Sequence, residues 1–373
     1  MTAVHQYQSD DQFIGEHLQG TSRTFALAIP LLAIERRQQI GLSYLLFRVA
    51  DSIEDAPEGD SLLKKQLLNR LKNYFSRHDG SQPEESASEF TSSDRKSSGH
   101  TDLTTPALAC FGGLWSAESP TGRLLLEFPR LLSIFDKQPP NVSQVIGNAL
   151  TSTITGMIRF IDASRDFPNQ IQIQTVNDLR LYCYAVAGIV GELLTDIFII
   201  HHPAGLVDHQ ELRTLSVGFG EFLQLINILK DAGRDAMNGR VFIPVEVSRE
   251  TIYELAMSGQ SDALMYIRLL EKNDFPRDII FYCRFLYLLA EGSLRKLREG
   301  GTGSKLTRDE VIRLLSVVQS ESCVLPIPDS SVSGSSGIKL NAGHAGLGEH
   351  RGPHLPVPDV SPVRPVETHI VPQ

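Results

Sequence analysis

The chain has 373 residues, of which 41% are hydrophobic, so it can bury a sizeable core as one large domain or two ordinary ones. Its 35 basic and 44 acidic residues give a formal net charge of −9, which argues against a nucleic-acid partner because phosphate binding needs a concentrated basic surface. The four cysteines contain no CxxC pair, so they indicate neither a zinc ribbon nor a disulfide framework and favour a reducing, cytoplasmic setting.

Three segments are predicted to lack fixed structure. Residues 1–10 have no basic-then-apolar layout of a signal peptide. Residues 76–104 contain eight serines and almost no aliphatic side chains, which predicts a flexible insertion. Residues 324–373 hold eight of the 20 prolines, which predicts a disordered tail with no apolar run able to anchor in a bilayer. A single domain is therefore expected over residues 11–320.

Within that domain, apolar residues recur at three- and four-residue spacing, which predicts helices, and no stretch alternates in the manner of a strand. The predicted helices span residues 31–56, 61–75, 120–136, 141–163, 178–200, 209–238, 249–258, 261–272, 276–298 and 307–319. The longest apolar segment, Tyr182–Ile200, contains Glu192 and Asp196, which favours a buried helix over a membrane span. The expected fold is all-α, a helical bundle around a shared interior.

The first acidic helix ends in the sequence YLLFRVADSIED, residues 44–55. At about 100° per residue, Tyr44, Arg48, Asp51 and Asp55 fall within an arc of roughly 60°, and Glu54 lies beside them. A solvated helix end with an Arg–Asp pair would explain the row without a ligand. However, acids near a helix C-terminus oppose the macrodipole, and their placement is favourable if a cation binds there. Both aspartates could each give an oxygen to magnesium.

The second acidic helix contains QLINILKDAGRD, residues 224–235. Gln224, Asn227, Asp231 and Asp235 fall within an arc of roughly 80°, and apolar residues fill the other directions. A buried hydrogen-bond ladder is the alternative without a ligand, but buried carboxylates without partners are costly, and the row itself contains no lysine or arginine. Two such rows facing across a cavity would gather magnesium ions and a ligand rich in phosphate oxygens.

Small residues interrupt two of the apolar helices. Ala185, Ala187, Gly188 and Gly191 remove bulk from the helix that begins near Tyr182. In another helix, Gly156 is small and the neighbouring Met157 is pliable, and both properties suit a hydrocarbon channel. Close helix packing explains these residues equally well. With the acidic rows, they indicate an apolar ligand that carries a diphosphate head.

Four motifs, in this order along the chain, resemble the squalene and phytoene synthase family of head-to-head prenyl transferases. They are SRTFALAIP (residues 22–30), YLLFRVADSIED, YCYAVAGIVGELL (182–194), and QLINILKDAGRD followed by GRVFIP (239–244). The resemblance covers roughly residues 10–320. It implies an isoprenoid-synthase fold with a central cavity in which two prenyl diphosphates are condensed with the help of Mg²⁺.

The motifs are nearest to bacterial-type squalene synthases. This favours two farnesyl diphosphates as substrates, with presqualene diphosphate as intermediate, squalene as product and NADPH as the reductant. The alternatives are a phytoene or dehydrosqualene synthase that performs no reduction, and an inactive family member that serves as an assembly factor. An ordinary terpene cyclase with one diphosphate substrate is disfavoured by the central motif. We expect a cytoplasmic monomer without a transmembrane segment that can touch a membrane peripherally.

The resemblance also implies a role for each motif residue. The metal ligands would be Asp51, Asp55, Asp231 and Asp235, with Glu54 in support. The residues that contact diphosphate would be Ser22, Arg23, Arg48, Asn227, Lys230 and Arg240. The reacting centre would be lined by Tyr44, Tyr182 and Gln224, with Tyr182 handling a proton. Two residues depart from the family pattern, because Lys230 stands where arginine is common and Arg234 where many relatives have an acid.

Overall fold

The computed structural model describes residues 9–22, 24–56, 60–78, 115–164, 171–202, 209–301 and 303–320. All of them lie within Met1–Ile327, which forms one compact unit. The predicted tail and nearly all of the predicted insertion lie outside the described residues. The predicted disordered N-terminus, residues 1–10, is one residue too long, because Asp10 begins a helix. The predicted insertion, residues 76–104, starts three residues too early, because Ser76–His78 form a 3₁₀ turn.

The described chain is almost wholly helical, as expected. In order, the helices are α1 (Asp10–Thr21), α2 (Phe25–Ala28), α3 (Ile34–Glu54), α4 (Ser61–Phe75), α6 (Pro120–Leu126), α7 (Phe128–Phe135), α8 (Pro140–Ala163), α9 (Val176–Cys183), α10 (Ile189–Ile200), α11 (His209–Met237), α12 (Arg249–Lys272), α13 (Arg277–Gly300) and α14 (Arg308–Gln319). A π-helical turn, Tyr184–Gly188, joins α9 to α10. The two strands are β1 (Ile171–Gln172) and β2 (Arg240–Val241).

Three differences from the predicted helices have local causes. Helix α1 was not predicted; Ser9 caps it by accepting a hydrogen bond from the Gln12 amide. The predicted helix over residues 120–136 is two helices, because Pro129 in the first turn of α7 cannot donate a backbone hydrogen bond. The two predicted helices over 249–272 are the single helix α12. Its central glycine, Gly259, lets α12 approach α11, since an added Cβ would lie 2.8 Å from the Gly218 carbonyl oxygen.

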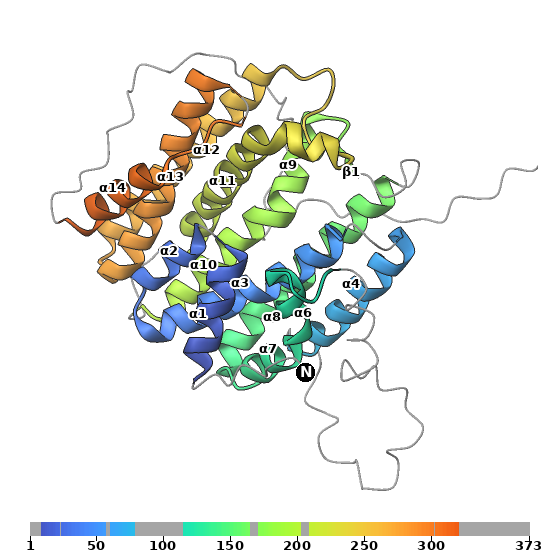
Figure 1. Ribbon diagram of the computed structural model, residues 1–373. Helices are drawn as coiled ribbons and strands as arrows, with labels where there is room; N and C mark the ends of the chain where they lie inside the picture. The colour runs from blue at the N-terminus through green and yellow to red at the C-terminus, as the bar shows by residue number, and fades with distance from the viewer. Residues whose placement is uncertain are drawn as a thin grey trace, which may run out of the picture. The chain divides into compact units, whose positions relative to one another are not determined.

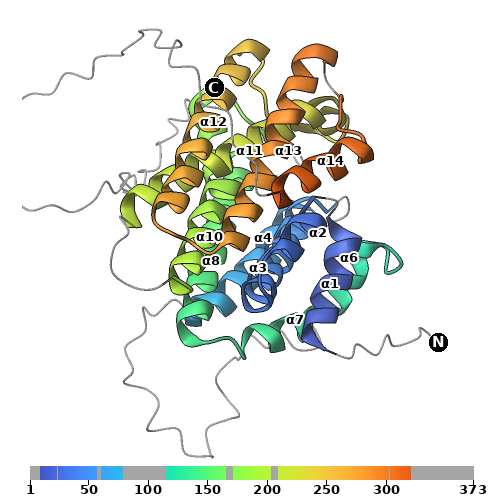
Figure 2. The same cartoon turned by 90° about the vertical axis from the view of Figure 1, so that its left-hand side faces the viewer.

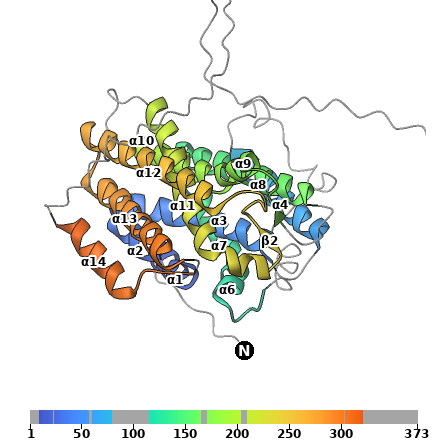
Figure 3. The ribbon, with the colours of Figure 1, turned by 90° about the horizontal axis from the view of Figure 1, so that it is seen from above.

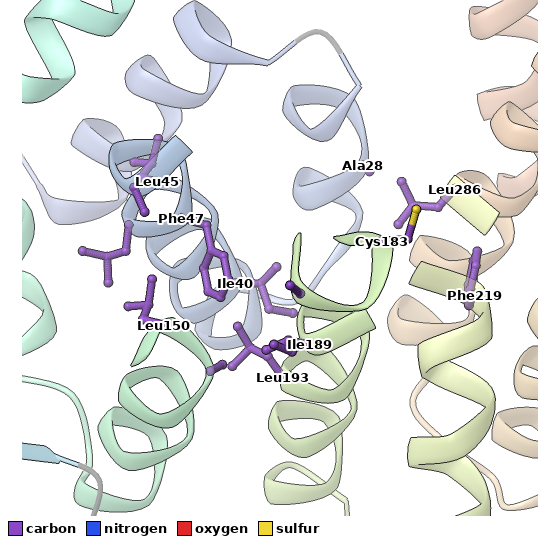
Figure 4. Packing of buried hydrophobic residues seen from close by; sticks show 14 of the residues in the cluster. Ala28, Ile40, Leu45, Phe47, Leu150, Cys183, Ile189, Leu193, Phe219 and Leu286 are labelled. Carbon is purple, nitrogen blue, oxygen red and sulfur yellow. The ribbon is translucent and has the colours of Figure 1, made fainter. Parts of the chain in front are cut away.

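Helices α3 and α11 lie in the middle of the bundle. In Figures 1 and 3, α12, α13 and α14 lie on one side of them, and α4 and α8 lie on the other. Figure 2 shows α1, α6 and α7 together at the end of the bundle away from the tops of α12 and α13. The core is continuous: Ile40 and Phe47 of α3 pack near Ile189 and Leu193 of α10, as Figure 4 shows. The two acidic helices are therefore held in fixed positions by buried apolar contacts on most of their surfaces.

The small residues of the central helix serve close packing. An added Cβ at Gly191 would lie 2.2 Å from the Ser216 carbonyl oxygen, and one at Gly220 would lie 2.2 Å from that of Ala187. Gly156 leaves room for Ala185 in the same way, with 2.6 Å to its Cβ. Close packing thus accounts for Gly156, Gly191 and Gly220, while Ala187 and Gly191 also line an apolar cavity.

Two short strands make a parallel pair in which Ile171 lies opposite Arg240 and Gln172 opposite Val241. No strand was predicted, because two residues are too few to show an alternating pattern. The chain enters β2 through Gly239, whose φ of 76° suits glycine and ends α11 as predicted. The pair matters for function because it fixes the position of Arg240 beside both acidic helices.

Within the described residues, the stretch Val176–Ile200 is long and apolar enough to cross a membrane by length and composition, and part of it is buried inside the bundle.

Candidate active site

A polar cavity of about 960 Å³ opens between the ends of the two acidic helices. The first row contributes Arg48, Glu54 and Asp55 to its wall. The second row contributes Gln224, Asn227, Asp231 and Asp235. Tyr182 of α9 and Arg240 of β2 close the remaining sides. The structure therefore brings the two predicted rows to face one another across a shared space.

A smaller cavity of about 280 Å³ adjoins the polar one and is mostly apolar. Gln224 and Asn227 line both cavities, so the two spaces meet at the polar row of α11. The apolar space extends between α3, α10, α11 and α13, with Phe47, Leu194 and Phe219 among its walls. Tyr44 and Asp51 face it from α3. A molecule with a charged head and a hydrocarbon tail would fit across this junction.

The carboxylates of the first row lie in an environment that opposes their charge. Burial raises the pKa of Asp51 to about 7, with Asp55 adding to the effect and Arg48 opposing it. Burial, together with Asp55 and Asp51, also raises the pKa of Glu54 well above its usual range. The Oε1 atom of Glu54 and the Nε atom of Arg48 are buried without a hydrogen-bond partner. Such groups indicate that the described chain alone does not satisfy this part of the cavity.

The carboxylates of the second row are paired with cations that come from outside the row. Arg240 contacts Asp55 and lies 3.3 Å from Asp235, so its guanidinium bridges the two acidic helices. Asp231 lies 2.9 Å from Arg234, 3.5 Å from Lys305 and 3.7 Å from Lys230. The four members of the row include no lysine or arginine, as the sequence shows, but Lys230 and Arg234 beside them on α11 reach Asp231. Sequence position gave no sign that β2 and the segment before α14 would also reach the row.

The comparisons with known proteins agree with this architecture. A family described as squalene/phytoene synthase matches residues 18–301. The chain belongs to the squalene/phytoene synthase family. It is 29% identical over 234 residues to a squalene synthase of Candida albicans, covering 62% of this chain and 45% of the relative. A squalene synthase of Cyberlindnera jadinii is 28% identical over 273 residues, covering 72% and 54%. The chain thus spans about half the length of the curated relatives it matches.

Solved structures show the same fold. The complex of TcSQS with the ligand E5700 has a TM-score of 0.60 at 20% identity, covering 84% of this chain and 86% of that chain. The complex with BPH1237 has a TM-score of 0.59, also at 20% identity, covering 83% and 86%. The predicted all-α fold of squalene synthases is confirmed, as is the family resemblance.

The motif residues of this family do not all lie in the cavity wall. Ser22 accepts a hydrogen bond from the Phe25 amide at 2.9 Å, and it neighbours Tyr44. Lys230 lies behind the wall and donates to Asn227 Oδ1 at 2.7 Å. Arg23 lies outside the described residues. The other predicted site residues line one of the two cavities or both.

Tyr182 is held by aromatic neighbours. Its ring stacks on Phe242 at 4.9 Å between centroids and meets the edge of Phe160 at 5.2 Å. Burial, and then the carboxylates of Glu54, Asp55 and Asp51, raise the pKa of its hydroxyl well above the usual range. Like an unperturbed tyrosine, this phenol is protonated at neutral pH, so it can donate a hydrogen bond into the cavity that it lines.

Among the described residues, no group of three or more acidic, histidine or cysteine side chains is arranged to hold a metal ion without other ligands. The donor set nevertheless fits magnesium, which commonly binds through one or two carboxylates together with phosphate oxygens. The unpartnered Oε1 of Glu54 and the raised pKa of Asp51 are features that a cation would relieve. The family's cation would thus be shared between this chain and an anionic ligand.

Sequence reasoning missed several residues of the wall. Lys64 of α4 and Trp115 line the polar cavity but belong to none of the four motifs. The Trp115 indole donates to the Ser52 carbonyl oxygen at 2.7 Å, which ties it to the first acidic helix. The one available signal was that Trp115 is the chain's single tryptophan. Nothing in the helical pattern of residues 61–75 distinguished Lys64 from its neighbours.

Proposed function

We propose that this chain catalyses the Mg²⁺-dependent head-to-head condensation of two prenyl diphosphates. The observation that carries the proposal is the junction of two spaces, one lined by carboxylates and cations and the other by hydrocarbon side chains, at Gln224 and Asn227. A prenyl diphosphate has the same division between head and tail. The family and the names of the similar proteins point in the same direction.

In this proposal the first substrate loses its diphosphate, and the resulting allylic cation is attacked by a double bond of the second. Loss of a proton gives a cyclopropyl diphosphate, which then loses its own diphosphate and rearranges. Magnesium, when bound through Asp51, Asp55, Asp231 and Asp235, would neutralise the charge that develops on the leaving diphosphate. The apolar walls exclude water, which would otherwise capture the cation.

The chain's own residues have separate tasks in this scheme. Arg48 and Arg240 supply fixed positive charge to diphosphate oxygens, and their Nε atoms are free to donate. The Tyr182 hydroxyl, which is protonated at neutral pH as in any tyrosine, donates to a departing diphosphate oxygen. Tyr44, whose hydroxyl donates to the Thr21 carbonyl oxygen at 3.3 Å, shapes the start of the apolar space.

For the finer chemistry we propose farnesyl diphosphate as substrate, with presqualene diphosphate as intermediate. Reduction by NADPH would give squalene, and loss of a proton would give dehydrosqualene instead. We also propose a cytoplasmic protein that approaches a membrane peripherally, because a long hydrocarbon product is insoluble in water.

One incubation tests the proposal. Purified protein is mixed with Mg²⁺ and either farnesyl or geranylgeranyl diphosphate, with and without NADPH, and extracted hydrocarbons are identified by mass spectrometry. We expect squalene from farnesyl diphosphate when NADPH is present. A 40-carbon product from geranylgeranyl diphosphate would replace the substrate assignment but keep the reaction. No coupled product from either substrate, in protein shown to be folded, would overturn the proposal and favour an inactive family member.

A further inference from the structure

Lys64 is a buried ammonium that faces the polar cavity. It lies in the first turns of α4 and is only 8% exposed. Burying an ammonium is costly unless a counter-ion or several acceptors compensate it. Yet Lys64 makes no ion pair with any described carboxylate, and its single described hydrogen bond goes to a neutral atom, the Glu54 carbonyl oxygen, at 3.0 Å.

The neighbouring Lys65 is a useful comparison, because its side chain does not face the cavity and has a carboxylate partner. Lys65 follows on the same helix, is 31% exposed at its side chain and pairs with Asp162 at 2.6 Å. It does not line the cavity. Both residues are lysines in the same turn of α4. Lys65 has a carboxylate partner and Lys64 has none among the described residues, because the two side chains face different surroundings.

The hydrogen bond to Glu54 accounts for only part of the Lys64 ammonium. That carbonyl lies in the last turn of α3, where backbone acceptors lack partners within the helix and a cation is favourable. An ammonium has three N–H donors, and one suffices for this contact. The other two have no acceptor among the described residues, and the side chain borders the space that Arg48 and Arg240 also line.

We infer that Lys64 binds the anionic head group of the ligand, as a third cation on the α3–α4 side of the polar cavity beside Arg48 and Arg240. This inference rests on the proposed function, because it assigns a diphosphate contact within the same cavity. It adds to the motif residues a side chain from a helix that carries none of them. The hydrogen bond to Glu54 orients the ammonium, and its two remaining donors reach diphosphate oxygens.

The test measures binding of inorganic pyrophosphate with Mg²⁺ by isothermal titration calorimetry on the full chain. Lys64→Gln removes the charge but keeps a donor for the Glu54 carbonyl, and Lys64→Met removes both. A charge-assisted hydrogen bond is worth enough that either change should weaken pyrophosphate binding by about 10- to 100-fold. Lys64→Arg should bind within about fivefold of wild type, because the charge is kept. Lys65→Met is the matched control and should bind like wild type.

Melting temperatures of the same proteins, with and without pyrophosphate, separate binding from structure. If Lys64→Gln binds pyrophosphate like wild type, the inference is wrong. It is equally wrong if Lys64→Arg and Lys64→Gln lose affinity alike and both melt early, because Lys64 would then only support α4. If Lys64→Met does not fold, Lys64→Gln alone decides. If pyrophosphate binding depends on Lys64 but the protein forms no coupled hydrocarbon, the proposed function is wrong and this inference stands.

Discussion

The two acidic helices end in the same residue spacing but in different electrostatic states. At the end of α3, Asp51 and Glu54 have raised pKa values, and Glu54 has a buried oxygen without a partner. At the end of α11, Asp231 contacts three cations and Asp235 contacts Arg240. Among the described residues, Asp51 and Glu54 of the first helix have no cation in contact with their carboxylates, whereas both aspartates of the second row do. Burial raises the pKa of Asp235 too, and Arg240 also contacts Asp55, so the contrast rests on Asp51 and Glu54.

Two motifs with the same Asp-x-x-x-Asp spacing can therefore contribute differently to the free energy of binding. A cation and diphosphate entering beside α3 relieve a cost that the fold already bears, which strengthens their binding. The same ions binding to Asp231 or Asp235 must first displace arginine or lysine, and at Asp55 they must displace Arg240. We therefore expect the α3 side to supply most of the binding free energy, and the α11 side to respond to changes in its own cations.

The largest expected effects come from removing one carboxylate from each helix. Asp51→Asn and Asp231→Asn should each reduce hydrocarbon formation below detection, because a ligand to the cation is lost. Their stabilities should differ. Asp51→Asn should unfold at the same or a higher temperature in EDTA, since burial and repulsion disfavour the charge that it removes. Asp231→Asn should lose about 1 kcal/mol, because its cations are left without a partner.

Product analysis and thermal unfolding of both variants in EDTA check this contrast. Adding Mg²⁺ with a non-reacting diphosphate analogue should stabilise wild type and do so much less in either variant. Near-normal turnover in either variant would contradict a two-helix cation site. Equal stability losses in both would contradict the electrostatic difference between the helices.

A smaller effect is expected for Tyr182→Phe, which removes one hydroxyl between the helices and keeps the ring stacked on Phe242. If the hydroxyl donates to the departing diphosphate, the single-turnover rate should fall by about 10²- to 10⁴-fold. Affinity for pyrophosphate should change little, because the cations and metal dominate binding of the head. If the residue is only a wall, turnover should stay within about tenfold and stability should fall by about 1 kcal/mol. Rate and melting temperature measured on one preparation distinguish the two.

The sequence predicted what depends on local periodicity. The polar rows of α3 and α11 follow from spacing within one helix. The structure places members of both rows on the polar cavity, while Tyr44 and Asp51 face the adjoining apolar one. Contacts between distant segments were not predictable in this way. Arg240 lies 185 residues from Asp55, and Lys305 belongs to the segment before α14, so no pattern near either aspartate indicated these two contacts. Arg234, by contrast, lies three residues after Asp231 on the same helix. The predicted break between residues 258 and 261 was wrong, because Gly259 continues α12 and lets it approach α11, which the sequence of α12 alone does not show.

Removing Arg234 is the mildest substitution that takes a cation away from an aspartate of α11. Its side chain is 60% exposed and pairs with Asp231 at 2.9 Å within the same helix, and an exposed pair of this kind is worth about 0.2–1 kcal/mol. Arg234→Ala should therefore barely alter stability. It should lower the Mg²⁺ concentration needed for half-maximal turnover by at most about fivefold, since one competitor for Asp231 is removed.

The matched control for Arg234→Ala is Arg295→Ala on α13, where a similarly exposed arginine pairs with Glu291 at 3.7 Å away from both cavities. A Mg²⁺ titration of turnover should shift for the first variant and stay unchanged for the second. The direction of the shift carries the information. If Arg234 instead holds the diphosphate, its loss should raise the Mg²⁺ and substrate requirements, and the cations around Asp231 would then be part of the binding site rather than competitors for it.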